Sequence, residues 1–287
     1  MRSYAALFVQ GAHLMRLKFW GVRGSIPTPQ PENLRYGGNT PCLEFRSDAG
    51  ALLIVDCGTG IRMLGKALVE EFGSRPIRAH VLISHYHWDH IQGLPFFLPL
   101  YRKANEFRFH SFDLPQASLE KTLQGQMANP YFPVDMGAMP AVRGFAEITE
   151  SPLKINDFTV LSRRINHPQG CLSFRIENRA RSVVYATDNE PGEPSSDRTI
   201  RDLARGADIL IYDSQYSREQ LGKEKKGWGH STWEEGVRVC QDAGVKELVL
   251  FHHDPDSNDQ VIDKIQESAR ARFPNSRAAF EGLEITL

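Results

Sequence analysis

One short segment of the chain carries four side chains of the kinds that bind metal ions. His85, His87, Asp89 and His90 fall within six residues, in the sequence Ser-His-Tyr-His-Trp-Asp-His of residues 84–90. Alternate residues of an extended backbone point to the same side, so the first two histidines can converge, and the following turn can aim the other two side chains at a neighbouring point. Imidazole nitrogen combined with carboxylate oxygen suits zinc or a similar divalent ion. A polar loop that merely contains histidines would not explain this spacing, so we predict a metal site.

Further ligand-type residues stand at the predicted ends of other strands. His167 lies in Asn-His-Pro, Asp188 follows an apolar run, and His252 and His253 follow another. Taken singly, His167 or Asp188 could equally be a turn or cap residue. Loops at one edge of a sheet commonly build sites, so we expect these residues to join the cluster.

The elements that must position these residues follow from hydrophobic patterning. Apolar, β-branched runs predict strands, and a 3.6-residue period predicts helices. The predicted strands are 17–20, 42–45, 51–56, 79–84, 158–165, 172–176, 182–187, 208–212 and 247–251. The predicted helices are 61–72, 199–205, 232–243 and 259–273, the third with Thr232 at a capped start.

Two segments depart from this patterning. Residues 26–38 are rich in Pro and Gly and are predicted to be loop. Residues 94–139 carry several prolines, and we interpret them as a long excursion of short helices and loops that forms a lid or wall of a site. No repeat, low-complexity tract or linker is visible. We therefore expect an N-terminal extension over 1–14 and one hydrolase-sized domain over 15–287.

Composition excludes several classes of protein. The 287 residues include 34 basic and 35 acidic side chains, so binding of nucleic acid through bulk charge is disfavoured. The four cysteines form no Cys-x-x-Cys pair, which argues against a disulfide framework or a thiolate zinc site and fits a reducing compartment. No apolar run is long enough for a membrane span, and residues 1–14 make a weak signal peptide, so we expect a cytoplasmic protein.

The His-x-His-x-Asp-His segment and its ordered partners resemble the metallo-β-lactamase fold hydrolases, from about Met15 to the end of the chain. The resemblance implies an α+β fold, the four-layer αββα sandwich, with two divalent metal ions at one edge. It implies that the first ion is held by His85, His87 and His167, and the second by Asp89, His90 and His252, with Asp188 bridging them. His253 is the alternative to His252 as the last ligand.

Two later segments resemble the phosphodiesterase branch of that family, which includes tRNase Z-type endonucleases and the cyclic phosphodiesterase of the carbon–phosphorus lyase pathway. They are Gly-His-Ser-Thr at 229–232 and Tyr-Asp-Ser at 212–214. The resemblance implies that His230 approaches the scissile phosphate and that Asp213 orients it. A proton or hydrogen bond from such a histidine helps as charge develops, and a carboxylate behind it fixes the tautomer. The simpler interpretation of 229–232 is a helix N-cap with an incidental histidine.

Two early segments also fit this branch. Residues 20–25 resemble its glycine-containing opening, where the backbone can approach the metal site, and a direct substrate contact from Arg23 or Asn39 is a weaker expectation. Asp56, in Asp-Cys-Gly-Thr-Gly, is expected to support the ligand loops through hydrogen bonds.

The chain departs from the tRNA-processing enzymes in one respect. Only 20 residues separate His167 from Asp188, so the long tRNA-binding arm that those enzymes carry there is missing. Together with the near-neutral charge, this favours a small phosphodiester over a large nucleic acid. The Cys-rich zinc-holding segment of some carbon–phosphorus lyase relatives is also missing, which weakens assignment to that pathway.

We therefore predict a metal-dependent phosphoric diester hydrolase acting on a cyclic nucleotide or cyclic phosphate. Attack would come from a hydroxide bridging the two ions, with Asp89 accepting its proton and with His230 and Asp213 completing the catalytic set. Trp88, Tyr131, Phe132 and residues of the excursion 94–139 could form a wall for a base or other organic group, although such residues more often pack in a core or lid. An ester, thioester or lactone hydrolase on the same ligand set is the alternative, and a non-enzymatic metal-stabilised binding module is a third hypothesis.

The metal and the assembly are less constrained. Histidine-rich ligation suits Zn²⁺, while the two carboxylates also tolerate Mn²⁺ or iron. We expect a small-molecule partner and no membrane association. Family relatives are often homodimers, but nothing in the sequence indicates a dimer face.

Overall fold

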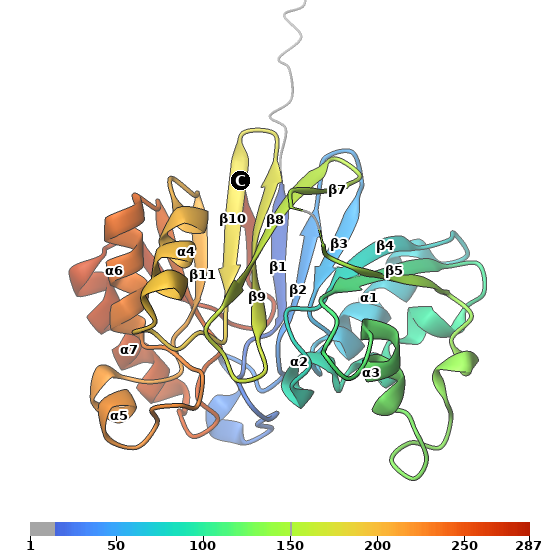
Figure 1. Ribbon diagram of the computed structural model, residues 1–287, viewed down its shortest axis with the longest axis horizontal. Coiled ribbons are helices and arrows are strands. Elements are labelled where there is room, and N and C mark those ends of the chain that lie inside the picture. The colour runs from blue at the N-terminus through green and yellow to red at the C-terminus, as the bar shows by residue number, and fades with distance from the viewer. Residues whose placement is uncertain (1–14, 150) are drawn as a thin grey trace, which may run out of the picture.

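The computed structural model of the protein describes residues 15–149 and 151–287, so the expected extension 1–14 lies outside the described residues. The chain forms two seven-stranded sheets that pack face to face (Figure 1). The first sheet has the order β14 (Glu284–Thr286), β1 (Arg16–Gly21), β2 (Cys42–Arg46), β3 (Leu52–Val55), β4 (Arg78–Leu82), β5 (Glu106–Ser111) and β6 (Val142–Glu147).

The second sheet has the order β13 (Ser276–Ala278), β12 (Glu247–Phe251), β11 (Ile209–Asp213), β10 (Arg181–Ala186), β9 (Cys171–Asn178), β8 (Phe158–Ile165) and β7 (Leu153–Ile155). Its strands β10 to β13 run parallel, whereas β7 to β10 pair antiparallel. The carboxyl ends of β10, β11 and β12 therefore meet at the same edge of the sheet, where residues far apart in sequence can converge.

Helices cover the outer face of each sheet. On the first sheet lie α1 (Ile61–Phe72), α3 (Leu119–Gly125) and the short η2 (Leu94–Phe96), η3 (Leu98–Tyr101) and η4 (Met136–Ala138). On the second lie α4 (Pro194–Ala204), α6 (Trp233–Ala243) and α7 (Asp259–Arg272). The remaining helices are η1 (Pro31–Asn33), α2 (Trp88–Ile91) and α5 (Arg218–Lys223).

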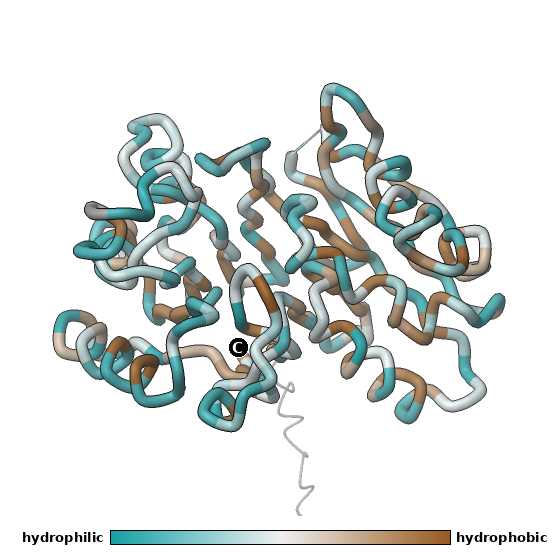
Figure 2. The backbone as a smooth tube through the Cα atoms, turned by 90° about the horizontal axis from the view of Figure 1, so that it is seen from below, coloured by the Kyte–Doolittle hydropathy of each residue, from teal (hydrophilic) through white to brown (hydrophobic). Residues whose placement is uncertain are grey.

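Three hydrophobic clusters hold these layers together. One lies between the sheets and includes Phe19, Phe45, Phe174 and Phe251, and the other two lie between each sheet and its helices. Figure 2 shows hydrophobic residues along the inner segments and hydrophilic ones along many outer turns. The expected αββα sandwich is confirmed.

Local sequence explains where the helices beside the later ligands begin. The Thr232 side chain accepts the N–H of Glu235 and caps α6, as predicted. Helix α4 begins at Pro194, five residues before the predicted start, because the Glu193 side chain accepts the N–H groups of Ser195 and Ser196. Proline is well suited to that first turn, since its missing N–H needs no partner there.

The interpretation of residues 94–139 as helices and loops alone was wrong. The excursion contains β5, which pairs in parallel with both β4 and β6 inside the first sheet. Phe107 and Phe109 are buried, while Arg108 between them is exposed, which is the alternation of a half-buried strand. Strands β6, β7, β13 and β14 were also missed.

Two expectations drawn from composition concern the cysteines and membrane-spanning segments. All four cysteines are buried and free. Within 15–149 and 151–287, no helix combines the length and the hydrophobicity needed to cross a bilayer.

Candidate metal centre

The predicted ligands come from separate strand ends and meet at one edge of the sandwich. The segment after β4 and the start of α2 carry the four residues of the His-x-His-x-Asp-His motif, and α2 lies at the lower edge between the two helical layers in Figure 1. His167 follows β8, Asp188 follows β10 and His252 follows β12. Their donor atoms form two groups, one of His85, His87 and His167 and one of Asp89, His90, Asp188 and His252, with all atoms of a group within 4.8 Å of one another.

Asp188 lies between the two groups. Its Oδ1 is 3.8 Å from Nε2 of both His85 and His167, whereas its Oδ2 is 3.2 Å from Nε2 of His90 and 3.4 Å from Nε2 of His252. Each carboxylate oxygen thus faces a different group. This is the arrangement that a bridging carboxylate requires.

The histidines turn one ring nitrogen toward the centre and use the other for support. His167 Nδ1 lies 2.8 Å from the carbonyl oxygen of Gly229, and His90 Nδ1 lies 2.8 Å from Asp56 Oδ2. Both partners accept a hydrogen, so each Nδ1 carries the proton and each Nε2 keeps its lone pair for the centre.

Two glutamines that sequence reasoning missed support the other histidines. Gln215 Oε1 lies 3.1 Å from Nδ1 of His252, and Gln169 Oε1 lies 2.7 Å from Nε2 of His87. His87 therefore presents Nδ1, which is 3.0 Å from His167 Nε2. The only sequence feature that could have indicated them is their position: Gln169 lies two residues after His167, and Gln215 lies two residues after Asp213.

Asp56 is the hub of this support. Its carboxylate accepts the backbone N–H and the hydroxyl of Ser84 at 2.7 and 2.8 Å, and the hydroxyl of Tyr185 at 2.7 Å, in addition to the contact with His90. The side chain is fully buried. Asp56 therefore links the segment that leads into the motif to Tyr185 of the second sheet. These hydrogen bonds agree with the supporting role expected for this residue.

The donor set fits divalent metal ions. His85 Nε2 is buried and has no hydrogen-bond partner among the described residues, although it points toward Asp188. Leaving a buried polar atom unsatisfied costs about 1–3 kcal/mol, so native proteins rarely do it without a ligand. A metal ion that accepts this lone pair removes the penalty, and the nitrogen and oxygen donors around it suit zinc, manganese or iron.

The carboxylates of the centre stay ionised. Burial alone would raise the pKa of Asp188, but the electrostatic interaction with His252, His90 and His85 holds that pKa well below its usual range. Burial likewise opposes ionisation of Asp89, and His90 and His252 lower its pKa. Two buried carboxylates that remain negative are suited to bind cations.

His230 and Asp213 form a pair beside the ligand groups. His230 Nδ1 is 3.0 Å from Asp213 Oδ2 and 3.6 Å from Asp188 Oδ1. Burial disfavours the imidazolium, yet the Asp213 carboxylate raises the pKa of His230 to about 9. Asp213 also accepts the backbone N–H groups of Asp188 and Gln215, so one buried carboxylate ties three loops of the centre together.

The backbone is held in an uncommon conformation at the same place. Ser25, Asp56, Asp188 and His252 all have positive φ values between 55° and 65° without being glycine. Such residues cost free energy and persist where the surrounding structure fixes them, often at functional sites.

Two glycines allow close approach of the backbone to the ligand rings. A Cβ atom on Gly229 would lie 2.2 Å from His167 Nδ1, and one on Gly24 would lie 2.5 Å from His252 Nδ1. The opening segment 20–25 thus does approach the centre. In the same segment, Ser25 donates its backbone N–H to Asp89 Oδ2 at 2.8 Å.

Other residues that the sequence suggested lie outside the cluster. His253 contacts the carbonyl oxygen of Ala279 through Nε2, and Asn39 donates to Glu281. Arg23 is fully buried, and its guanidinium donates to the carbonyl oxygens of Gly37, Asp254 and Ser257. Arg23 and Asn39 thus brace loops, and a substrate contact from either residue stays a prediction.

A cavity of about 400 Å³ opens onto the centre. It is lined by Ser25, Tyr86, His87, Trp88, Asp89, Asp188 and His230. Of the three aromatic residues suggested as a wall, Trp88 lines it, whereas Tyr131 and Phe132 do not. Phe132 instead packs on Phe96.

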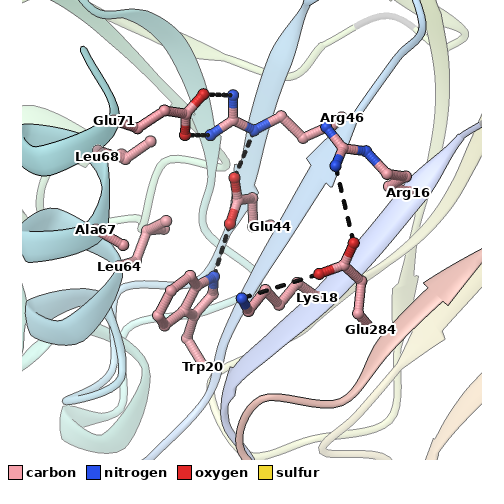
Figure 3. Close-up of a pocket in the computed structure, with 10 residues that line it drawn as sticks. All are labelled: Arg16, Lys18, Trp20, Glu44, Arg46, Leu64, Ala67, Leu68, Glu71 and Glu284. Atoms are coloured by element: carbon pink, nitrogen blue, oxygen red, sulfur yellow. Dashed lines mark hydrogen bonds and ion pairs between the residues drawn. The ribbon is translucent and has the colours of Figure 1, made fainter.

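A second cavity, of about 200 Å³, lies between β1, β2 and α1 (Figure 3). Trp20 Nε1 donates to Glu44 at 2.8 Å, and Arg46 joins Glu44 to Glu71 with contacts of 2.5 and 2.7 Å. The charged groups drawn there satisfy one another. Among the described residues, none of the groups of donors that could hold a metal ion lies in this cavity, whereas the centre at the sheet edge contains them.

Comparison with known proteins agrees with this geometry. The family described as the beta-lactamase superfamily domain matches residues 52–253. A ribonuclease Z from Archaeoglobus fulgidus is 24% identical over 326 residues, covering 95% of this chain and 98% of its own.

Solved structures show the same fold. The metallo-beta-lactamase fold protein YhfI from Bacillus subtilis has a TM-score of 0.71 at 21% identity, covering 96% of this chain and 100% of its own. A diphosphatase from the PhnP family has a TM-score of 0.69 at 17% identity, covering 96% and 97%. With the family match spanning most of the chain, the protein belongs to the beta-lactamase superfamily.

Proposed function

We propose that the protein is a metal-dependent phosphodiesterase that cleaves a small phosphodiester, such as a cyclic nucleotide or cyclic phosphate. One observation carries this proposal. His230, backed by the buried Asp213, lies 3.6 Å from Asp188, the carboxylate between the two ligand groups, and lines the cavity. The presence of a ribonuclease and a diphosphatase among similar proteins supports phosphate chemistry.

The ligand groups would each hold one ion, with Asp188 shared. Two divalent ions there would lower the pKa of water toward about 7 and offset the charge of the phosphate. Zinc suits the histidine-rich set best, and manganese or iron is tolerated. Asp89, whose Oδ2 already accepts the N–H of Ser25, is placed to accept a proton from the attacking water.

His230 assists the leaving oxygen. Asp213 holds its Nδ1, so its Nε2 is left to donate a proton or hydrogen bond to the leaving oxygen. Burial lowers the pKa of His230, but the Asp213 carboxylate raises it to about 9, which favours the protonated form that a general acid needs. Asp213 acts through His230 by fixing its orientation.

The size of the site supports a small substrate. The cavity holds about 400 Å³, and β9 and β10 fill the interval between His167 and Asp188 without a protruding arm. The formal net charge of −1 offers no extended field for a polynucleotide backbone. A large nucleic acid is therefore not part of the proposal.

The test is a substrate panel with wild-type protein and His230→Ala. Bis(p-nitrophenyl) phosphate and 2′,3′- and 3′,5′-cyclic nucleotides represent diesters, and p-nitrophenyl acetate, a thioester and a lactone represent the alternative. We expect metal-dependent cleavage of at least one diester and a large loss in His230→Ala. Cleavage confined to the acyl substrates, unchanged in His230→Ala, would favour the acyl hydrolase.

A further inference from the structure

Trp88 is a large aromatic side chain held in water beside the metal centre. It lies between His87 and Asp89 at the first residue of α2, and 79% of its surface is exposed. Scattered exposed hydrophobic residues are ordinary. Trp88 differs because it lines the same cavity as Asp188 and His230.

The other three tryptophans of the chain all have partners. Trp20 donates to Glu44, Trp228 lies under the Lys225 ammonium at 4.2 Å, and Trp233 is buried. Within the described residues, the Trp88 ring has no hydrogen bond, ring contact or cation above its face. Its exposure is therefore not explained by packing or by a polar partner.

Backbone hydrogen bonds anchor the main chain that carries this ring. The carbonyl oxygen of Trp88 accepts the N–H of Gln92 at 2.7 Å, and His90 N–H bonds to the carbonyl oxygen of His87 at 3.0 Å. The neighbours on both sides belong to the ligand groups. The backbone from which the indole projects is thus anchored at the mouth of the site.

We propose that Trp88 is a stacking platform for the planar base of the substrate, so that the substrate class is nucleotide diesters and not sugar or lipid phosphodiesters. This inference rests on the proposed function for the position of the phosphate. A flat aromatic face gains most from a second flat aromatic group, and every nucleobase offers one. The cavity places that face next to the residues that would receive the phosphate.

The same geometry limits how selective the site is. Stacking tolerates any base because all have a π face, and preference follows stacking strength. We therefore expect purine nucleotides to bind more tightly than pyrimidine nucleotides. Removal of one stacking aromatic group weakens binding by about 5- to 150-fold.

The experiment compares the binding of AMP and ribose 5-phosphate, which differ by the base, to zinc-loaded protein by calorimetry. The variants are Trp88→Ala, Trp88→Phe and the control Phe96→Ala, a ring that is 53% exposed but does not line the cavity. Zinc content is measured for each. We expect Trp88→Ala to bind AMP about 5- to 150-fold more weakly, with ribose 5-phosphate unchanged, Trp88→Phe to restore most of the affinity, and Phe96→Ala to match the wild type.

Three results would overturn the inference. They are an AMP affinity unchanged in Trp88→Ala, an equal loss for both ligands, and no measurable binding of AMP to the wild type. The outcome is separable from the proposed function. A base-dependent loss without diester cleavage would leave the platform standing and remove the phosphodiesterase, while diester cleavage without a base-dependent loss would do the reverse.

Discussion

Two cavities of this molecule each contain charged side chains and a tryptophan, but they differ in how their charges are satisfied. Between β1, β2 and α1, Arg46 lies between Glu44 and Glu71, and Trp20 completes the set, so donors and acceptors match (Figure 3). At the sheet edge, the carboxylates of Asp89 and Asp188 stand among histidines whose free nitrogens all point inward.

The difference shows which polar cluster is built for a ligand. A set of ion pairs that closes on itself stabilises the fold and leaves nothing to bind. At the sheet edge, His85 Nε2 is left without a protein partner while Asp56 and Gln215 orient its neighbours from behind. Support on the outer nitrogens combined with unsatisfied inner atoms is what a metal centre needs.

The largest effect is expected from Asp188→Ala, because it removes the carboxylate shared by both groups. We predict diesterase activity to fall on the order of 10³-fold or more, since ions of this kind contribute several kcal/mol to the transition state. Metal content, measured by mass spectrometry, should fall with it. Glu44→Gln in the other cavity is the matched control and should keep both.

His230→Ala separates catalysis from metal binding. We expect kcat to fall about 10²- to 10⁴-fold, the range of a lost general acid, while metal content stays at the wild-type level. His230→Ala protein that loses its metal ions to the same extent as Asp188→Ala would show that this histidine is a ligand and not the acid.

Gln215→Ala tests the support behind His252. Gln215 Oε1 lies 3.1 Å from Nδ1 of His252, and Gln215 Nε2 donates to the Ser25 hydroxyl at 3.1 Å. Loss of such a partner typically lowers metal affinity about 10- to 100-fold. A competition titration with a zinc chelator measures this, and an unchanged affinity would mean that the ring is held by its backbone alone.

The smallest effect on activity is expected from Glu44→Gln. The Glu44 carboxylate accepts hydrogen bonds from Arg46 and Trp20, so we predict a loss of about 1.5–3 kcal/mol in the free energy of unfolding, the usual contribution of hydrogen bonds to a charged group. Urea denaturation gives this number. The kcat should stay within about twofold of wild type, and a larger drop would contradict the separation of the two cavities.

The sequence predicted the parts of this comparison that depend on local spacing. His85 and His87 are two residues apart, and strand patterning placed His167 and Asp188 at strand ends, so their convergence followed from the expected fold. Gln215 and Gln169 could not be predicted, because their role depends on distances across the fold that no short pattern encodes.

The fold was predictable to a similar depth. Strands with long apolar runs, such as β8 and β12, lie where patterning placed them. Strand β5 was not predicted, because the prolines on both sides of it suggested loop. Its pairing with β4 and β6 depends on contacts between residues distant in sequence. The early start of α4 depends on capping by Glu193, a residue outside the usual N-cap set.

The most direct test of the account is a metal titration of chelator-stripped protein, followed by calorimetry and by diester cleavage at each step. The account predicts about two zinc ions per chain, with cleavage of bis(p-nitrophenyl) phosphate appearing only as both groups fill, and loss of the second equivalent in Asp188→Ala. Full diester cleavage in protein that holds no metal, or two ions bound as tightly by Asp188→Ala as by the wild type, would contradict it.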